Sequence, residues 1–302
     1  MAHFKSWITA FRLRTLPLAF SGWLVGTTIA SIAVKISWPI AGLTLLTAFL
    51  LQILSNLAND YGDAVSGVDS DERKGPSRMV QSGQITKKAM GRAMIIFSLL
   101  CLLSGVALLF ITFKEDFISA LVFFLIGIVG IASAIKYTVG KNPYGYAGFG
   151  DLFVFLFFGV VLIFGTYYLQ VQTFDGLVLL PAISLGMLSI GVLNVNNIRD
   201  IESDKVSGKN SIPVRLGREK AVVYHIFLLA GSFLIMVSYS IIIYHSWWQF
   251  IFLPVGLLFG VNIKAVATKP LTELDPFLKQ MAISTLIFSV LFSAGILLGA
   301  NF

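Results

Sequence analysis

The sequence has few charged residues. Only 12% of its 302 residues are Asp, Glu, Lys or Arg, whereas 57% are hydrophobic. An average soluble protein carries about twice that charged fraction. Long, nearly uncharged runs exceed the roughly 20 residues that a helix needs to cross the hydrocarbon of a bilayer. The composition therefore excludes an ordinary soluble domain. It predicts an all-α integral membrane protein, with one membrane-embedded domain over residues 1–302.

Cysteine and histidine are also scarce. The one cysteine, Cys101, lies in an apolar run, so it cannot form an internal disulfide and says little about the compartment. The three histidines are scattered without a partner pattern. Gly-rich nucleotide loops of the Walker or Rossmann type are absent. We therefore expect no catalysis by histidine and no nucleotide-binding loop.

The apolar runs predict nine transmembrane helices in a bundle, which would place the two termini on opposite sides of the membrane. A signal peptide is not expected at the first run, because its polar lead is long and the chain stays membrane-embedded afterwards. The predicted helices cover residues 15–34, 38–60, 93–113, 117–136, 151–170, 176–197, 221–243, 247–264 and 280–299.

Basic residues are concentrated in alternate loops, and this pattern predicts the orientation. The segment before the first helix and every second loop after it are rich in Lys and Arg, whereas the other loops hold only Lys35 and Lys114. By the positive-inside rule the N-terminus is cytoplasmic and the C-terminus is outside, in a cytoplasmic (inner) membrane. Because topology explains the net charge of +7, we expect the lipid bilayer as a partner and no nucleic acid.

Two acidic clusters lie at the ends of long apolar segments. One reads Asn59-Asp60-Tyr61-Gly62-Asp63 with Asp69 further on, and the other reads Asn196-Asn197-Ile198-Arg199-Asp200 with Asp204. In both, Asn and Asp are four residues apart, so they share one face of a helix. Carboxylates beside a bilayer are costly and usually mark a function.

The two clusters indicate an internal repeat. Asn59 and Asn196 are 137 residues apart (196 − 59), as are Asp63 and Asp200 (200 − 63), and a Ser-Gly pair follows each cluster. We expect a repeat of four helices plus one added helix, with halves at about residues 1–140 and 141–275. Repeated halves in membrane proteins often form a site at their interface.

The acids predict a metal site that faces the cytoplasm. If the clusters converge, bare carboxylates repel one another and raise their own pKa values, and a divalent cation relieves this. Oxygen ligands without His or Cys suit Mg²⁺, Mn²⁺ or Ca²⁺. Mg²⁺ completes its shell with water and substrate phosphates, and a basic fringe would bind pyrophosphate. A simpler reading is that the acids pair with local Lys and Arg as solvated loop charges. The fringe consists of Arg78, Lys136, Lys141, Lys209 and Arg215.

Both clusters resemble the two Asp-rich motifs of the UbiA superfamily of intramembrane prenyltransferases. The resemblance extends over nearly the whole chain, since that family also has nine helices. Further segments resemble its 1,4-dihydroxy-2-naphthoate polyprenyltransferase branch, which serves menaquinone biosynthesis. These segments include Arg14-Thr15-Leu16-Pro17 and Gly75-Pro76-Ser77-Arg78. In the first motif, the spacing between Asp63 and Asp69 is wider than the corresponding spacing in the 4-hydroxybenzoate branch.

The resemblance implies an enzyme that transfers a polyprenyl group from polyprenyl diphosphate to 1,4-dihydroxy-2-naphthoate, with loss of CO₂ and diphosphate. It implies Mg²⁺ as cofactor and Asp63, Asp200 and Asp151 as catalytic residues. The implied metal ligands are Asn59, Asp63, Asp69, Asn196, Asp200 and Asp204. The implied substrate-binding residues are Arg14, Arg78, Lys136, Tyr137, Thr138, Lys141 and Lys209.

Some assignments have alternatives. Asp151 is expected to orient or deprotonate the acceptor, or only to cap its helix. Arg199 and Glu202 are interpreted as a local surface pair that points away from Asp200. A related prenyltransferase would use 4-hydroxybenzoate, homogentisate or a chlorophyllide as acceptor. A divalent-cation transporter is a weaker alternative, because its acids should lie near the middle of the bilayer on broken helices.

Overall fold

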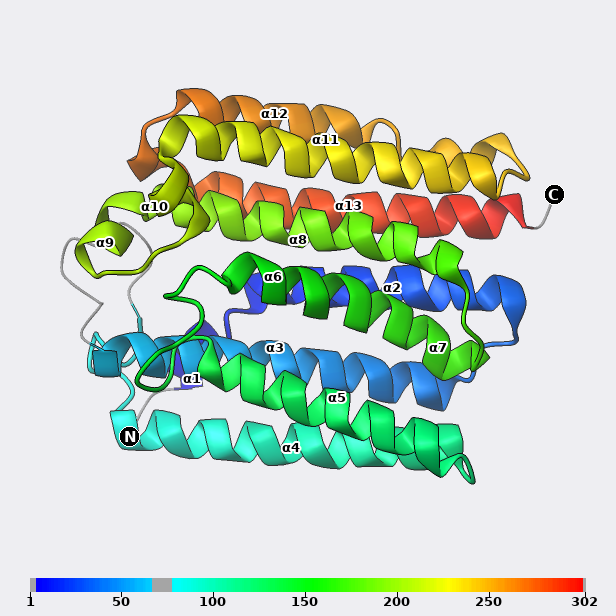
Figure 1. The fold of residues 1–302 in the computed structure, drawn as a ribbon, viewed down its shortest axis with the longest axis horizontal. Coiled ribbons are helices and arrows are strands. Elements are labelled where there is room, and N and C mark those ends of the chain that lie inside the picture. Colours follow the sequence, from blue (N-terminus) through cyan, green and yellow to red (C-terminus); the bar gives the residue numbers. More distant parts are fainter. Residues whose placement is uncertain (1–3, 67–77, 301–302) are drawn as a thin grey trace.

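The computed structural model describes residues 4–66 and 78–300, which form a bundle of long helices lying side by side (Figure 1). The elements in chain order are α1 (Phe4–Phe11), η1 (Leu13–Thr15), α2 (Leu16–Ala33), α3 (Trp38–Ser66), α4 (Lys87–Phe113), α5 (Phe117–Lys136), α6 (Gly150–Val154), η2 (Phe155–Phe164), α7 (Gly165–Val171), η3 (Gly176–Val178), α8 (Leu179–Arg199), α9 (Ile201–Val206), α10 (Ile212–Leu216), α11 (Arg218–Ile242), η4 (Trp247–Phe250), α12 (Val255–Thr268), η5 (Leu271–Glu273) and α13 (Asp275–Gly299).

The described residues contain nine segments that are long and apolar enough to cross a membrane, which confirms the predicted number of spans. The fifth span, Gly150–Val171, consists of α6, the π-helical segment η2 and α7 in succession. The first span begins at Phe4, because α1 and η1 precede α2 without a long break.

The ends of α3 and α8 differ from the predicted ends, and the difference places the two motifs differently. The helix predicted at residues 38–60 continues to Ser66, so Asn59 and Asp63 both lie inside α3, one turn apart on one face. In contrast, α8 ends at Arg199, and Asp200 is its C-cap residue. The first motif therefore lies on a continuous helix, and the second lies at a helix end.

The second half of the bundle is tightly packed. Buried apolar side chains from α8, α11, α12 and α13 form one continuous core with residues of α2 and η2. The last helix, α13, packs against both α2 and α8 and so closes the bundle. Small residues allow close helix contacts in membranes. At Gly159, for example, an added Cβ atom would lie 2.6 Å from the carbonyl oxygen of Ala182.

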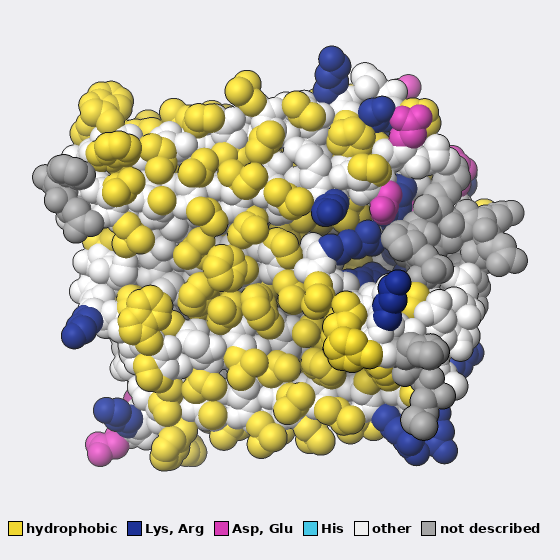
Figure 2. Space-filling view, turned by 180° about the vertical axis from the view of Figure 1, so that it is seen from behind, with side chains coloured by type: hydrophobic (Ala, Val, Ile, Leu, Met, Phe, Trp, Pro, Cys, Tyr) yellow, Lys and Arg dark blue, Asp and Glu magenta, His cyan; other side chains and the backbone are white. Residues whose placement is uncertain are grey.

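Large apolar side chains cover the sides of the bundle, and Lys and Arg gather mainly toward one end (Figure 2). Phe110, Phe117 and Ile118 are 80%, 79% and 78% exposed. Such a surface is costly in water but is suited to contact with lipid tails.

The motif-bearing ends of α3 and α8 lie at the same end of the bundle (Figure 1). The short helices α1, α9 and α10 lie at this end too. We call it the motif end. The expected convergence of the two clusters is therefore compatible with the topology of the helices.

Candidate active site

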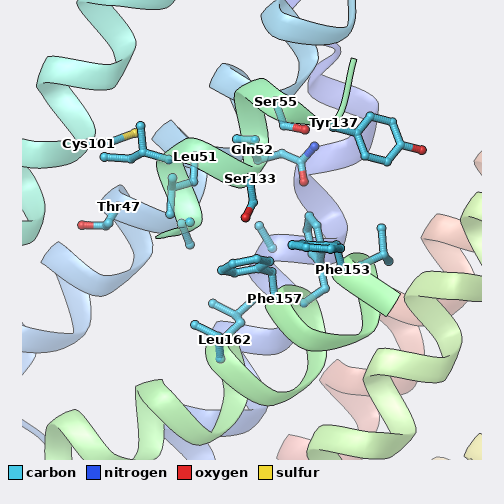
Figure 3. Close-up of a pocket in the computed structure, with 18 of the residues that line it drawn as sticks. Thr47, Leu51, Gln52, Ser55, Cys101, Ser133, Tyr137, Phe153, Phe157 and Leu162 are labelled. Atoms are coloured by element: carbon cyan, nitrogen blue, oxygen red, sulfur yellow. The ribbon is translucent and has the colours of Figure 1, made fainter. Parts of the chain in front are cut away.

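A cavity of about 400 Å³ lies between α2, α3, α4, α5 and the fifth span. Most of its length is apolar, with side chains such as Leu51, Phe157 and Leu162 (Figure 3). Near the motif end its lining becomes polar and charged. We call this part the polar end of the cavity. Its lining residues include Arg12, Arg14, Asn59, Asp63, Arg78, Tyr137, Thr138, Tyr146, Asn196 and Lys209.

The polar end has an excess of positive charge. Among the described residues, its charged lining consists of four cations and one carboxylate, Asp63. A buried, cation-rich cavity attracts anions, because water screens the charges poorly there. The cavity as a whole therefore suits an amphipathic ligand with an anionic head and a long apolar tail. The four cations are Arg12, Arg14, Arg78 and Lys209.

Asp63 is the central acid of the first motif. Its side chain is buried, its carboxylate forms an ion pair with Arg78, and the hydroxyl of Tyr146 donates a hydrogen bond to it. A buried carboxylate needs such partners, because desolvation without them is expensive. Arg78 also donates to the backbone carbonyl of Asn59. Arg78 thus joins both residues of the first Asn–Asp pair.

Asp60 has a structural role. Its buried carboxylate accepts hydrogen bonds from the backbone N–H groups of Met79 and Val80, at 3.0 and 3.1 Å. These bonds fasten the segment that follows Arg78 to the side of α3. Asp60 therefore helps to hold Arg78 close to Asp63, which the sequence did not reveal.

Gly62 allows a close contact with the segment after α5. A Cβ atom there would lie 2.6 Å from the carbonyl oxygen of Thr138. The hydroxyl of Thr138 donates to the carbonyl of Ala58 at 2.8 Å and to the amide oxygen of Asn59 at 3.3 Å. Thr138 is therefore next to the first motif, and both Thr138 and Tyr137 line the cavity.

The second motif is organised around Arg199, and here the surface-pair interpretation is wrong. Arg199 is only 2% exposed, and its guanidinium donates to both carboxylate oxygens of Asp200, at 2.8 and 2.7 Å. It also donates to the amide oxygen of Asn196 at 2.8 Å. A planar guanidinium can make this bidentate contact between neighbouring residues. Glu202, by contrast, is exposed.

Asp275 was not anticipated as part of this site. It opens α13 and accepts a hydrogen bond from Arg199 at 2.5 Å, and its other oxygen lies 3.7 Å from Arg14. The last helix therefore contributes an acid that links Arg14, at the polar end of the cavity, to the second motif. No sequence pattern marked Asp275, because it lies far from both motifs along the chain.

Asp204 and Lys209 form an ion pair at 2.9 Å beside the cavity. Burial raises the pKa of Asp204, Lys209 opposes this, and the carboxylates of Asp200 and Asp63 raise it further. Asp63 from the first motif and Asp204 from the second thus influence each other electrostatically. This is the repulsion expected when the two acidic clusters share one site.

The segment between α5 and α6 connects the two motifs. The side chain of Tyr146 donates to Asp63, while its backbone carbonyl accepts a hydrogen bond from the N–H of Asn210 at 2.8 Å. Arg215 donates to the carbonyl of Ala147 in the same segment. Burial and the nearby Asp63 raise the pKa of Tyr146, so its phenol stays a proton donor at neutral pH. Tyr146 was missed because a lone tyrosine in a loop carries no distinct signal.

Five of the described residues expected at the site do not line the cavity, and two of them, Asp200 and Asp204, lie just behind its lining. Lys136 and Lys141 are exposed and do not line the cavity. Asp151 accepts a hydrogen bond from the hydroxyl of Tyr224 at 2.9 Å and is not a lining residue either. The site does contain the other expected substrate-binding residues, Arg14, Arg78, Tyr137, Thr138 and Lys209. Asp69 lies outside the described residues.

The donor set fits a hard divalent cation such as Mg²⁺. Asn59, Asp63 and Asn196 bring amide and carboxylate oxygens to the cavity, and Asp200 and Asp204 lie just behind its lining. In the part of the chain that the structure describes, no group of three His, Cys, Asp or Glu side chains is gathered as for a metal ion held by protein alone. Mg²⁺ needs few protein ligands when substrate phosphates complete its shell. In this arrangement Arg78, Arg199 and Lys209 neutralise the acids.

Two solved structures share this fold. The apo structure of a UbiA homolog from Aeropyrum pernix K1 matches with a TM-score of 0.68 at 17% identity, covering 94% of this chain and 96% of that one. A UbiA homolog from Archaeoglobus fulgidus bound to GPP and Mg²⁺ matches with a TM-score of 0.59 at 17% identity, covering 97% and 100%. At this identity the similarity establishes the fold alone.

Sequence relatives are closer. The chain is 42% identical to a 1,4-dihydroxy-2-naphthoate octaprenyltransferase of Escherichia coli (strain K12), over 97% of this chain and 96% of the relative. It is 41% identical to the protein of the same name from Haemophilus influenzae, over 98% and 96%. Residues 19–286 match the UbiA prenyltransferase family. With its all-helical fold and two facing motifs, this chain therefore belongs to the UbiA prenyltransferase family.

Proposed function

We propose that the protein transfers a polyprenyl group from polyprenyl diphosphate to 1,4-dihydroxy-2-naphthoate, giving demethylmenaquinol (the reduced form of demethylmenaquinone), CO₂ and diphosphate. One observation carries the proposal: a single cavity joins a cation-rich polar end, with Asn59, Asp63 and Asn196, to a long apolar part. This shape complements a diphosphate head and an isoprenoid tail. The names of the relatives favour dihydroxynaphthoate over other aromatic acceptors.

The polar end binds and orients the diphosphate. Arg78 and Lys209 line it and can approach phosphate oxygens, and Tyr137, Thr138 and Tyr146 offer hydroxyl donors. Mg²⁺ held by Asn59, Asp63, Asn196, Asp200 and Asp204, with Asp69, would supply further positive charge to the diphosphate when bound. The apolar part holds the near end of the tail, and a longer tail can continue into lipid.

The reaction begins with cleavage of the C–O bond, whose electron pair leaves with the diphosphate. Arg78 and Lys209 stabilise the negative charge that develops on this leaving group. The allylic cation needs a dry site, which a cavity inside a membrane bundle provides. The ring faces of Phe153 and Phe157 line the cavity and can stabilise the cation. The electron-rich ring carbon that bears the carboxylate then forms the new C–C bond. Its bond to the carboxylate breaks, so CO₂ leaves and the electron pair of that bond restores the aromatic ring.

The motif end faces the cytoplasm in this proposal, where the aromatic acceptor and the diphosphate head of the lipid substrate are accessible. The support is the concentration of Lys and Arg at this end (Figure 2). The protein would then be a multi-pass protein of the cytoplasmic membrane, with its C-terminus outside.

The test uses the purified full-length protein in lipid vesicles, with a polyprenyl diphosphate and a panel of aromatic acids. Wild type should prenylate 1,4-dihydroxy-2-naphthoate and release diphosphate and CO₂, as measured by product mass and labelled CO₂. EDTA should stop turnover without lowering the melting temperature of the protein, and added Mg²⁺ should restore it. Prenylation of 4-hydroxybenzoate or homogentisate in preference to the naphthoate would contradict the proposed acceptor. Turnover in EDTA would contradict the metal role.

A divalent-cation transporter fits the structure less well. Its ligands should lie near the middle of the membrane on interrupted helices, whereas Asn59 and Asp63 lie near the last turns of a continuous α3. Ion-flux measurements on the same vesicles would separate the two functions.

A further inference from the structure

A polar residue lies in the cavity below its cation-rich end. Gln52 is on α3, seven residues before Asn59, so about 10 Å separates the two along the helix axis. The amide of Gln52 points into a space that Ser133, Phe153 and Phe157 also border (Figure 3). Around it the lining is mostly apolar. A glutamine at this depth is costly unless its polar atoms have partners.

The neighbouring Asn56 fixes the orientation of this amide. The Nδ2 group of Asn56 donates to the carbonyl of Phe11 and to the hydroxyl of Thr15, both at 2.9 Å. Its Oδ1 atom must therefore accept, and it does so from Nε2 of Gln52 at 3.4 Å. A flipped Gln52 amide would place two oxygens against each other. The Oε1 atom is consequently directed away from Asn56.

This Oε1 atom has no hydrogen-bond partner among the described residues, although Gln52 is only 8% exposed. An unsatisfied buried acceptor is rare and costs stability. Such a group is expected where a ligand supplies the missing donor. Neither part of a polyprenyl diphosphate can do so, because the ionised diphosphate carries only acceptors and the tail is a hydrocarbon.

We propose that Gln52 Oε1 accepts a hydrogen bond from a ring hydroxyl of the aromatic acceptor and thereby selects hydroxylated arenes. This inference rests on the proposed function and adds the residue that recognises the second substrate. The location suits the chemistry, since the reactive end of the tail must lie just below the diphosphate at Asn59. An acceptor ring held at Gln52 lies under that carbon, beside Phe153 and Phe157.

The site would discriminate between aromatic acceptors because a wrong ring leaves the Oε1 atom of Gln52 without a donor. A ring without the hydroxyl leaves Oε1 unpaired, and a carboxylate or carbonyl at this point places two acceptors against each other. A site built to receive a hydroxyl rejects analogues that lack it more strongly than an apolar pocket rejects an extra group. Gln52 is therefore a specificity-determining residue and takes no part in breaking the C–O bond.

The experiment compares inhibition constants, because removing a hydroxyl also changes the reactivity of the ring. 1-Hydroxy-2-naphthoate and 4-hydroxy-2-naphthoate each lack one hydroxyl and compete with 1,4-dihydroxy-2-naphthoate. In wild type, one of them should bind about tenfold more weakly than the other. In Gln52→Met, which keeps the length of the side chain, the two constants should become nearly equal. The KM for 1,4-dihydroxy-2-naphthoate should rise about tenfold and the KM for prenyl diphosphate should stay unchanged.

The matched control is Gln170→Met. Gln170 is partly buried on α7 and bonds both the N–H and the carbonyl of Ser37, remote from the motifs. This variant should leave the preference between the analogues intact. If Gln52→Met retained the preference between the two analogues, the inference would be overturned. A water molecule, and not the acceptor, would then be the donor to Oε1 of Gln52. Equal constants in wild type would overturn it even if Gln52→Met failed to fold. Failure of the proposed function is seen separately, since wild type would then not prenylate 1,4-dihydroxy-2-naphthoate at all.

Discussion

The two halves of the bundle carry matching motifs in very different surroundings. Helices α3, α4 and α5 of the first half line the cavity. In α4 and α5, only 22% and 11% of the residues in the most apolar stretch are buried inside the protein. In the second half, 67% of the residues in the most apolar stretch of the α8 span are buried, and the apolar residues among them belong to a continuous apolar core. The cavity thus lies between the loosely packed helices of the first half and the fifth span, while α8 borders it from a densely packed core.

The same asymmetry appears in the acids. Asp63 lines the cavity and is paired with Arg78 from a distant segment. Asp200 is turned to its neighbour Arg199, which is itself tied to Asp275. A repeated motif therefore does not produce two equivalent half-sites. We infer that Asp63 faces the ligand in the cavity directly, whereas Asp200 lies behind the lining residue Asn196.

The largest effect is expected from Asp63→Asn. The substitution removes the charge that lines the cavity and leaves Arg78 without its carboxylate, so kcat/KM for diphosphate release should fall about 10³-fold. Circular dichroism should show unchanged helix content. The control is Glu273→Gln, which alters an exposed ion pair with Lys269 at the same end of the bundle and should retain activity. Wild-type activity in Asp63→Asn would remove this residue from the site.

Gly62→Ala should have the next largest effect. Its Cβ atom would meet the backbone of Thr138, which cannot move aside like a flexible side chain. We expect a lower melting temperature and about a tenfold loss of kcat/KM, because Thr138 is displaced from Asn59. Gly42→Ala on the same helix is the control: its Cβ atom has open space, and alanine favours the helix by about 0.5–1 kcal/mol. Equal behaviour of the two variants would show that the close contact is unimportant.

Asp275→Asn tests whether the last helix organises the second motif. Arg199 would keep Asp200 but lose its charged partner on α13, and Arg14 would lose its partner too. We expect a lower melting temperature and a KM for prenyl diphosphate raised about fivefold. An unchanged KM with a lower melting temperature would limit Asp275 to a structural role.

Tyr146→Phe should have the smallest effect. It removes the hydroxyl that donates to Asp63 and keeps the ring, and Asp63 retains Arg78 as its partner. The loss therefore corresponds to the low end for one hydrogen bond, about 0.5 kcal/mol, or about a twofold rise in the KM for prenyl diphosphate. Tyr224→Phe is the comparison: it removes a hydroxyl that donates to Asp151, and because neither residue lines the cavity, it should change this KM less. A larger effect at Tyr224 would indicate that Asp151 takes part in the reaction.

Sequence reasoning was successful where a strong local pattern decided the outcome. Long apolar runs specified the nine spans, because hydrocarbon accepts a backbone only when its polar groups are paired within a helix. The spacing of Asn59 and Asp63 specified that both face one way. Sequence reasoning did not reveal that Lys136 and Lys141 lie outside the cavity lining, and it was wrong for Arg199, which is buried. Their basic character was visible, but their direction depends on neighbours that are remote in sequence.

By itself, the amino-acid sequence determined the membrane class, the helical architecture and the presence of two oxygen-rich clusters at the ends of apolar helices. Only the tertiary structure decided that Asp63 faces the cavity, that Arg199 is buried against Asp200, that Asp275 joins them and that Gln52 has an unsatisfied oxygen. The physical reason is that apolar burial depends on the sum over a long segment, which can be read along the chain. A polar side chain is placed by one or two specific partners, and these come from whichever helix happens to pack beside it.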